Sequence, residues 1–480
     1  MYDATFSLPG HTMIEHSLSV PLDRFGALSR FAADEAAAIP EKIELFAREY
    51  VRHGNEKLPR LVYFQGGPGF GGPRMAPIGS WLDTALNHYR VVLLDERGTG
   101  RSHPIEAQAV SAVGPTPVQA AFISCFRQDS IAADAEDLRL AFGGDPWAVL
   151  GQSFGGFVVT ACLSQAPQGL SEAFITAGLP SVEGCADDVY RLTYAQTDVR
   201  NREFFDRYPG DESVAWSVAK HLADVEERLP TGERLTPGRF RQIGICLGRS
   251  YGLEQLHFLL EDPFWTVRGA RRLRPQFLDR IGAQVSLAPA PLYGVMHEAI
   301  YAQASTGATA WSADRIRGEF PQFRLPDVAA GAAAESELEA EGRGFRFTGE
   351  HMYPWQMRED PALAPIADAA DALAADPSLR RLYDAEALAA NGAAAEREVR
   401  AGRGDSAAHE AAVGRDATAA RRVPAAAWVY KQDMFVPYSI SMETARLAGF
   451  RTLVSDTFHH DGLHSGGPQM ILKLIEAVRG

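Results

Sequence analysis

The stretch that decides the fold is Trp147-Ala-Val-Leu-Gly-Gln-Ser-Phe-Gly-Gly-Phe-Val-Val-Thr-Ala-Cys162, which indicates a buried strand, a sharp turn and a helix. Ser153 lies at the turn, between Gly151 and Gly155 in a Gly-x-Ser-x-Gly pattern. Small residues beside the serine let a strand run into a helix without side-chain collision, and the serine hydroxyl is then exposed. A nucleophile needs this geometry, so the stretch predicts a nucleophilic serine.

The same pattern occurs a second time, at Gly248-Arg-Ser250-Tyr-Gly252, so the motif alone does not identify the nucleophile. The surrounding sequence favours Ser153. A strand pattern precedes it, Gly156 lies where the following helix must pack closely, and a glycine-rich loop lies upstream. Ser250 instead falls in a region of helical periodicity without a parallel-strand pattern.

Composition and charge limit the class of protein. The chain has 480 residues, 46% of them hydrophobic and 22% charged, and a formal net charge of −14. These values are ordinary for a globular protein, and no apolar run approaches the roughly 18 residues of a membrane span. The negative charge disfavours nucleic acid and anionic membranes as partners. The first residues lack the pattern of a secretion signal, so we expect a cytoplasmic location.

The cysteines give no sign of a metal site or of a disulfide framework. Four cysteines in a chain of this length lie far apart and without the spacing of zinc ligands. They are Cys125, Cys162, Cys185 and Cys246. We expect reduced thiols, no metal ion and no cofactor, whereas the oligomeric state does not follow from the sequence.

Strand and helix patterns alternate along both ends of the chain. Short apolar runs followed by helical periodicity are typical of a mostly parallel sheet with helices on both faces. Besides the strand before Ser153, the expected strands span residues 16–21, 42–51, 60–65, 89–95, 173–177, 425–430 and 451–454. Helices are expected at residues 130–142, 440–448 and 470–478.

The middle of the chain differs from both ends because the alternation stops and helical patterns, aromatic residues and charges prevail. We therefore predict a core formed by residues 1–182 and 423–480, and an inserted, mainly helical cap at residues 183–422. Such an insertion lies above the carboxyl ends of the strands, where it can exclude water. Residues 329–344 and 392–422 have few large apolar side chains, and we expect flexible surface excursions there.

Two further features carry the chemistry of an acyl-transfer enzyme. The strand at residues 60–65 leads into Gly66-Gly-Pro-Gly-Phe-Gly-Gly-Pro73, whose backbone amides can point into a cleft and stabilise an oxyanion. A serine nucleophile also needs a histidine base and an acid that orients this base. In α/β-hydrolases both follow the serine in the chain, first the acid and then the histidine. Asp433 lies just after a strand, and three histidines follow in Phe458-His-His-Asp-Gly-Leu-His464.

Several motifs together resemble the longer form of the prolyl aminopeptidases, also called proline iminopeptidases, and the resemblance spans most of the chain. The motifs are Gly66-Gly-Pro-Gly69, Asp95-Glu-Arg-Gly-Thr-Gly-Arg-Ser102, Gly151-Gln-Ser-Phe-Gly-Gly156, Glu298 in His-Glu-x-Ile-Tyr, Glu350 in Gly-Glu-x-x-Tyr-Pro-Trp, and His460-Asp-Gly-Leu463. The resemblance implies an α/β-hydrolase fold and the release of N-terminal proline from peptides. It also implies Ser153 as nucleophile, Asp433 as orienting acid and His460 as base.

The substrate of such an enzyme suggests further roles. An exopeptidase must favour a free, positively charged terminus, and carboxylates in a water-excluding cap do so because an unpaired charge there is costly. Glu298 and Glu350 are the candidates for holding the imino group. The amides of Gly67 and Phe154 are the candidates for stabilising the oxyanion, and His460 would protonate the departing amine.

The chain departs from the family pattern at three places outside the proposed triad. Glu96 stands where many relatives have glutamine, Thr457-Phe458 replaces a Glu-Tyr pair, and His464 replaces an arginine. An esterase or a broader aminopeptidase of the same fold would share every core motif. A binding protein on a hydrolase scaffold is the other alternative, although it would not need the full set of nucleophile, acid and base.

Overall fold

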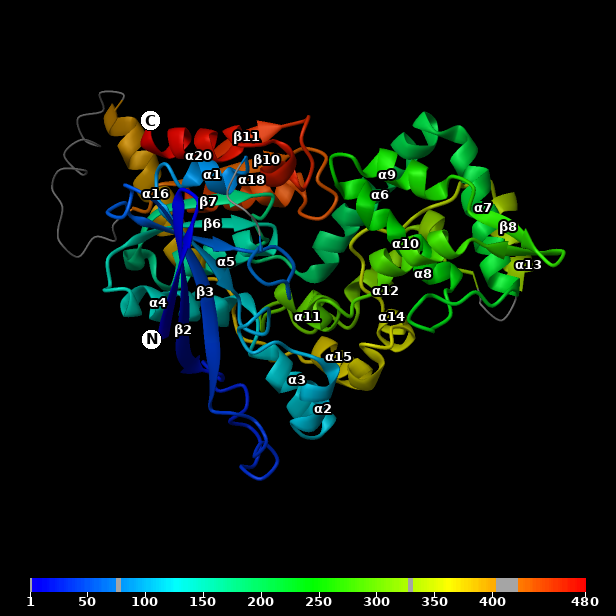
Figure 1. The fold of residues 1–480 in the computed structure, drawn as a ribbon, viewed down its shortest axis with the longest axis horizontal. Coiled ribbons are helices and arrows are strands. Elements are labelled where there is room, and N and C mark those ends of the chain that lie inside the picture. Colours follow the sequence, from blue (N-terminus) through cyan, green and yellow to red (C-terminus); the bar gives the residue numbers. More distant parts are fainter. Residues whose placement is uncertain (1, 75–78, 327–330, 403–421) are drawn as a thin grey trace.

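The computed structural model describes residues 2–74, 79–326, 331–402 and 422–480. These residues form one nine-stranded sheet with the order β1-β2-β3-β5-β4-β6-β7-β10-β11 (Figure 1). The first three strands and the β3–β5 pair are antiparallel, and the remaining pairs are parallel. The strands are β1 (Tyr2–Leu8), β2 (His11–Pro21), β3 (Lys42–Arg52), β4 (Arg60–Phe64), β5 (Arg90–Asp95), β6 (Trp147–Gln152), β7 (Leu170–Thr176), β10 (Ala425–Tyr430) and β11 (Arg451–Ser455). The predicted α/β-hydrolase sheet is confirmed.

Helices cover both faces of this sheet because the central strands are apolar on both sides. In β4, Val62 belongs to one buried cluster and Tyr63 to the other, as alternating side chains of a strand must. The first cluster includes side chains of α4 (Gln128–Ala141), α5 (Phe154–Gln165), α16 (Ala385–Gly402) and α18 (Tyr438–Ala448). The second cluster includes side chains of α1 (Trp81–Ala85) and α20 (Gln469–Arg479).

A mainly helical region lies beside the sheet, on the right of Figure 1. It contains many buried aromatic side chains, among them Phe240, Phe345 and Phe347, whose rings pack against one another. Its elements include α6 (Ala186–Arg207), α7 (Pro209–Asp224), α8 (Pro237–Arg241), α9 (Gly252–Leu260), α10 (Pro275–Val285), α11 (Pro291–Val295), α12 (Ser312–Arg317), α13 (Gly331–Ala340), α14 (Pro354–Glu359) and the hairpin of β8 (Phe264–Val267) with β9 (Ala270–Leu273). We call this region the cap.

Two segments differ from the sequence-based expectation. Helix α13 packs against α7 and buries Glu335, both of whose carboxylate oxygens accept hydrogen bonds from Arg241. This ion pair anchors the helix, so residues 331–340 are not an unpacked excursion. Helix α16 packs on α5 and α18, and it therefore belongs with the core by its contacts, although its residues were assigned to the cap. Residues 403–421 of the second expected excursion lie outside the described residues.

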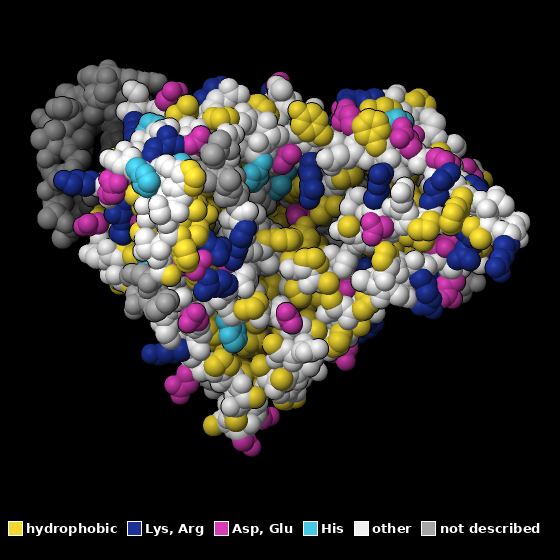
Figure 2. All heavy atoms as spheres, viewed as in Figure 1, with side chains coloured by type: hydrophobic (Ala, Val, Ile, Leu, Met, Phe, Trp, Pro, Cys, Tyr) yellow, Lys and Arg dark blue, Asp and Glu magenta, His cyan; other side chains and the backbone are white. Residues whose placement is uncertain are grey.

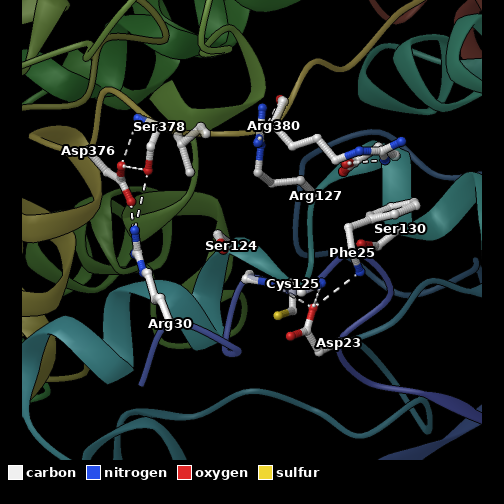
Figure 3. A pocket seen from close by; sticks show the side chains of 14 residues that line it. Asp23, Phe25, Arg30, Ser124, Cys125, Arg127, Ser130, Asp376, Ser378 and Arg380 are labelled. Atoms are coloured by element: carbon white, nitrogen blue, oxygen red, sulfur yellow. Dashed lines mark hydrogen bonds and ion pairs between the residues drawn. The ribbon is translucent and has the colours of Figure 1, made fainter. Parts of the chain in front are cut away.

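Arginines of the core join it to segments from the middle part of the chain (Figure 3). Arg127 at the start of α4 is buried and donates hydrogen bonds to the carbonyls of Ala299, Ala302 and Arg380. Arg30 pairs with Asp376 at 3.0 Å across a cavity of about 200 Å³. The polar groups around this cavity thus hold chain segments together. No helix in the described parts of the chain is both long and apolar enough to cross a membrane.

Candidate active site

Ser153 occupies the turn between β6 and α5 in a strained backbone conformation. Its φ of 54° and ψ of −123° lie outside the regions that L-residues normally adopt. A Cβ atom at Gly151 would lie 2.1 Å from the carbonyl oxygen of Gly155, and one at Gly155 would lie 2.1 Å from that of Phe64. Both glycines of the motif are therefore required for the turn to pack against its neighbours.

Ser153, His460 and Asp433 lie together, although more than 270 residues separate the serine from the other two. The Ser153 hydroxyl oxygen is 2.8 Å from Nε2 of His460, and Nδ1 of His460 is 2.8 Å from Oδ2 of Asp433. Asp433 follows β10 and accepts hydrogen bonds from the amides of Phe435 and Val436 at 2.9 and 3.0 Å. These amides hold the carboxylate in position to fix the orientation of the imidazole.

The surroundings of His460 favour its charged form. Burial disfavours the imidazolium, but the negative charge of Asp433 and its hydrogen bond outweigh burial and raise the pKa of His460 above 6.5. The ring of Phe435 packs edge-on against it, with centroids 4.7 Å apart. For His459 and His464 the direction is opposite, because burial lowers the pKa of both rings. Of the three clustered histidines, His460 is the one that contacts the serine.

The glycine-rich loop after β4 lies against the serine turn. A Cβ atom at Gly66 would be only 3.0 Å from Cβ of Ser153, so the close approach requires glycine. The carboxylate of Asp95 braces this loop by accepting hydrogen bonds from the amides of Gly72 and Arg101. Within the described residues, neither the Gly67 amide nor the Phe154 amide donates a hydrogen bond to another group. Both are free to bind an oxyanion.

These residues line a cavity of about 700 Å³ between the core and the cap. Figure 2 shows the surface hollowed between the two regions, with apolar side chains inside the hollow. Gly67, Ser153 and His460 line the cavity from the core. From the cap, the lining includes Arg249, Gln255, Gln284, Leu287, Tyr293 and Glu350. The volume is of the size that binds a small peptide or a drug-sized molecule.

Glu350 presents a carboxylate to this cavity. Its Oε1 accepts a hydrogen bond from the Tyr293 hydroxyl at 2.5 Å, and its Oε2 lies 3.8 Å from Nε2 of His297. Burial lowers the pKa of His297, so this ring is neutral near pH 7 and forms no ion pair with Glu350. A cationic group of a ligand would therefore find a partner in Glu350.

The structure does not place Glu298 at the cavity, contrary to the pairing of acids expected from the sequence. Its two carboxylate oxygens accept hydrogen bonds from the amides of Ser312 and Ala313, at 2.9 and 2.8 Å. These amides begin α12, whose first N–H groups have no partner within the helix. Glu298 therefore satisfies the first two N–H groups of this short helix. The side chain is buried, and burial raises the pKa of Glu298 to about 7.

Two lining residues were missed by the sequence analysis. Arg249 falls inside the second Gly-x-Ser-x-Gly match, and that match pointed to the right segment although not to the right residue. Tyr293 lies five residues before Glu298, in no recognisable motif, and its contact with Glu350 spans 57 residues. In the described residues, no cluster of three His, Cys, Asp or Glu side chains is arranged to hold a metal ion.

The fold, the serine turn and the adjacent histidine and aspartate define the class of protein: it is a hydrolase of the α/β-hydrolase fold. Residues 59–261 match the family described as the alpha/beta hydrolase fold. A proline iminopeptidase from Aeromonas sobria is 36% identical over 468 residues, which cover 97% of this chain and 96% of that protein. The chain belongs to the proline iminopeptidase family.

Other relatives are more distant. A proline iminopeptidase from Aspergillus aculeatus is 28% identical over 446 residues, which cover 90% of this chain and 88% of that protein. Among solved structures, a proline iminopeptidase-related protein from Thermus thermophilus has 14% sequence identity and a TM-score of 0.36. That match covers 97% of this chain and 98% of the other.

Proposed function

We propose that this protein is a serine exopeptidase that releases N-terminal proline from peptides through an acyl-enzyme intermediate. The observation that carries the proposal is that Glu350 lines the same cavity as Ser153 and His460, which are joined to Asp433 by a chain of hydrogen bonds. The first group supplies the chemistry of acyl transfer. The second supplies a negative charge for a free terminus.

Acylation begins when the Ser153 oxygen attacks the prolyl carbonyl carbon while Nε2 of His460 takes the hydroxyl proton. The carbonyl oxygen becomes negative, and the amides of Gly67 and Phe154 donate hydrogen bonds to it. His460 then gives its proton to the amine nitrogen as the peptide bond breaks. Asp433 stays ionised throughout and stabilises the imidazolium.

Deacylation repeats the sequence with water. His460 takes a proton from a water molecule, whose oxygen attacks the acyl carbon, and the same two amides stabilise the second oxyanion. Collapse of this intermediate breaks the bond to the Ser153 oxygen, which recovers the proton from His460. Free proline leaves, and the enzyme is regenerated.

Glu350 supports the choice of an exopeptidase. A secondary ammonium group at the N-terminus of proline is cationic, and Glu350 offers it a carboxylate that forms no ion pair with an arginine or lysine of the described residues. A peptide whose terminus is acylated cannot form this ion pair and would bury the carboxylate without a partner. We assign the imino group to Glu350 alone, because both oxygens of Glu298 already accept hydrogen bonds.

The test compares proline β-naphthylamide with its N-acetylated form. We expect hydrolysis of the free form and a loss of at least about 100-fold in kcat/KM on acetylation, the scale of a desolvated ion pair. Alanine β-naphthylamide and a short-chain naphthyl ester separate the alternatives. Equal rates with and without the acetyl group contradict an exopeptidase, and preference for the ester supports an esterase. The cytoplasmic location, the peptide substrates and the absence of nucleic-acid partners stay predictions.

A further inference from the structure

Arg249 is a cation in the cavity whose side chain pairs with no other described residue. Its side chain is exposed and lines the same cavity as Ser153 and Glu350. Within the described residues it makes no ion pair or side-chain hydrogen bond. This is unusual for a chain with a net charge of −14, in which most other arginines described are paired with carboxylates.

The two carboxylates of the lining accept hydrogen bonds from neutral donors. Glu350 accepts the hydrogen bond from Tyr293, and Asp461 accepts hydrogen bonds from both the amide and the hydroxyl of Ser250. Other polar side chains of the lining, Gln255 and Gln284 among them, are uncharged. Among the described lining residues Arg249 is the one arginine or lysine, so it is the group with which an entering carboxylate can pair.

The position of Arg249 relative to His460 is defined by the backbone. The amide of His460 donates a hydrogen bond to the carbonyl of Gly248 at 3.2 Å, and Ser250 is bound to Asp461. Arg249 therefore lies between two residues that are both attached to the loop carrying the base. Because His460 must reach the nitrogen of the departing amine, the leaving group lies on the same side as this loop.

From this geometry we propose that Arg249 binds a carboxylate on the leaving-group side of the substrate. The preferred substrates are then dipeptides with a free C-terminus, or peptides with an acidic residue after the proline. The two ends of the substrate are recognised by opposite charges, the imino group by Glu350 and the carboxylate by Arg249. This inference rests on the proposed exopeptidase function and names the class of its substrate.

The test measures one ratio, kcat/KM for Pro-Ala divided by kcat/KM for Pro-Ala amide. We expect a ratio of roughly 2 to 5 in the unaltered protein, because an exposed ion pair contributes at most about 1 kcal/mol. Arg249→Gln should bring the ratio close to one, and Arg249→Lys should keep part of it. Raising the salt concentration should lower the ratio in the unaltered protein, since salt screens exposed charges.

A matched control is Arg268→Gln. Arg268 is an exposed arginine of the cap outside the cavity, so this variant changes the net charge equally but should leave the ratio unaltered. A parallel ratio, Pro-Glu amide against Pro-Gln amide, separates the two sources of the carboxylate. If Arg249→Gln changes only the first ratio, Arg249 binds the terminal carboxylate of the substrate. If the variant changes only the second ratio, Arg249 binds the acidic side chain after the proline.

The outcomes are distinguishable. If neither ratio changes in Arg249→Gln while proline β-naphthylamide is still hydrolysed, the role of Arg249 is overturned and the proposed function stands. Failure of the unaltered protein to hydrolyse proline β-naphthylamide overturns both proposals, because that substrate carries no carboxylate. Equal changes in the Arg268→Gln variant show a general charge effect and also overturn the role of Arg249.

Discussion

Asp461, the residue after the proposed base, accepts two hydrogen bonds from Ser250, one from its amide at 2.9 Å and one from its hydroxyl at 2.6 Å. The two residues are 211 positions apart, one in the cap and the other in the core. Ser250 is the serine of the second Gly-x-Ser-x-Gly match, and its hydroxyl is thus occupied in holding the loop that carries His460. The two matches to one short pattern have different structural roles.

The first prediction separates the two serines. A fluorophosphonate should label the unaltered protein and Ser250→Ala, but not Ser153→Ala. Of these two serines, Ser153 is the one whose hydroxyl lies 2.8 Å from a histidine nitrogen that can take its proton. Ser250→Ala should lose about 1 kcal/mol of stability with its hydrogen bond, measured by thermal unfolding. Labelling of Ser153→Ala at an undiminished rate would contradict the assignment of the nucleophile.

The pH dependence of kcat/KM should reflect His460. The base acts only when neutral, and Asp433 raises its pKa, so activity should fall as the pH drops through a midpoint above 6.5. Asp433→Asn removes the charge that raises this pKa and should shift the midpoint to lower pH. It should also lower kcat by roughly 10⁴-fold, the effect of the same change in a Ser-His-Asp triad of another fold. An unchanged midpoint in the variant would exclude this role of Asp433.

Glu350 and Glu298 should behave differently when each is changed to glutamine. Glu350→Gln should lower kcat/KM for proline β-naphthylamide by about 10-fold to 100-fold, because the cationic imino group loses its charged partner. In Glu298→Gln, an amide NH₂ group would face an amide N–H of α12, which should cost about 1–3 kcal/mol of stability. Kinetics and thermal unfolding of both variants test the distinction, and the reverse pattern would return Glu298 to the binding site.

Acid unfolding should depend on Glu49 in β3. Burial alone would raise its pKa, but the hydrogen bond with His16 and the positive charges of Arg60 and Arg90 lower it to about 2. A carboxylate with a depressed pKa stabilises the folded state above the ordinary value of about 4.5, and this contribution is lost as the pH falls towards 2. This lowering of the Glu49 pKa corresponds to about 3 kcal/mol of folding free energy.

Thermal unfolding between pH 3 and pH 6 measures this contribution. As the pH is lowered from 6 to 3, the melting temperature of the unaltered protein should fall more steeply than that of Glu49→Gln. The reason is that the variant has no carboxylate to protonate at this position. Glu335→Gln is a useful comparison, since Glu335 is also buried and paired with an arginine. Parallel curves for the unaltered protein and Glu49→Gln would contradict the linkage.

Local patterns were sufficient for the sheet. The strands at β4, β5, β6, β7, β10 and β11 follow from short apolar runs, and their order of strand and helix indicates a parallel sheet. Periodicity and turn chemistry act between neighbours in the chain, which is why they can be recognised without a structure. Strand β1 was not expected, because it pairs only with β2 at the edge of the sheet and lacks a long apolar run.

The same reasoning explains the turn at Ser153. A strained φ of 54° and the close approach of Gly155 to the Phe64 carbonyl demand small residues at fixed positions, and this requirement is visible as a motif. The order of serine, aspartate and histidine on successive strand ends is likewise a property of the chain. The sequence by itself therefore determined the core fold and proposed three side chains that the structure places within hydrogen-bonding distance.

Only the tertiary structure decided which acids and which cation face the cavity. Glu298 and Glu350 both stand beside histidines and aromatic residues in the sequence, yet one caps α12 and the other accepts a hydrogen bond from Tyr293 at the cavity wall. Arg249 reaches the cavity because its neighbours bind the His460 loop. The contacts of Glu298 and Glu350 join cap residues 14 to 57 positions apart, and the Ser250–Asp461 contact joins the cap to the core across 211 positions. Such contacts depend on tertiary packing and leave no periodic pattern in the segments that they join.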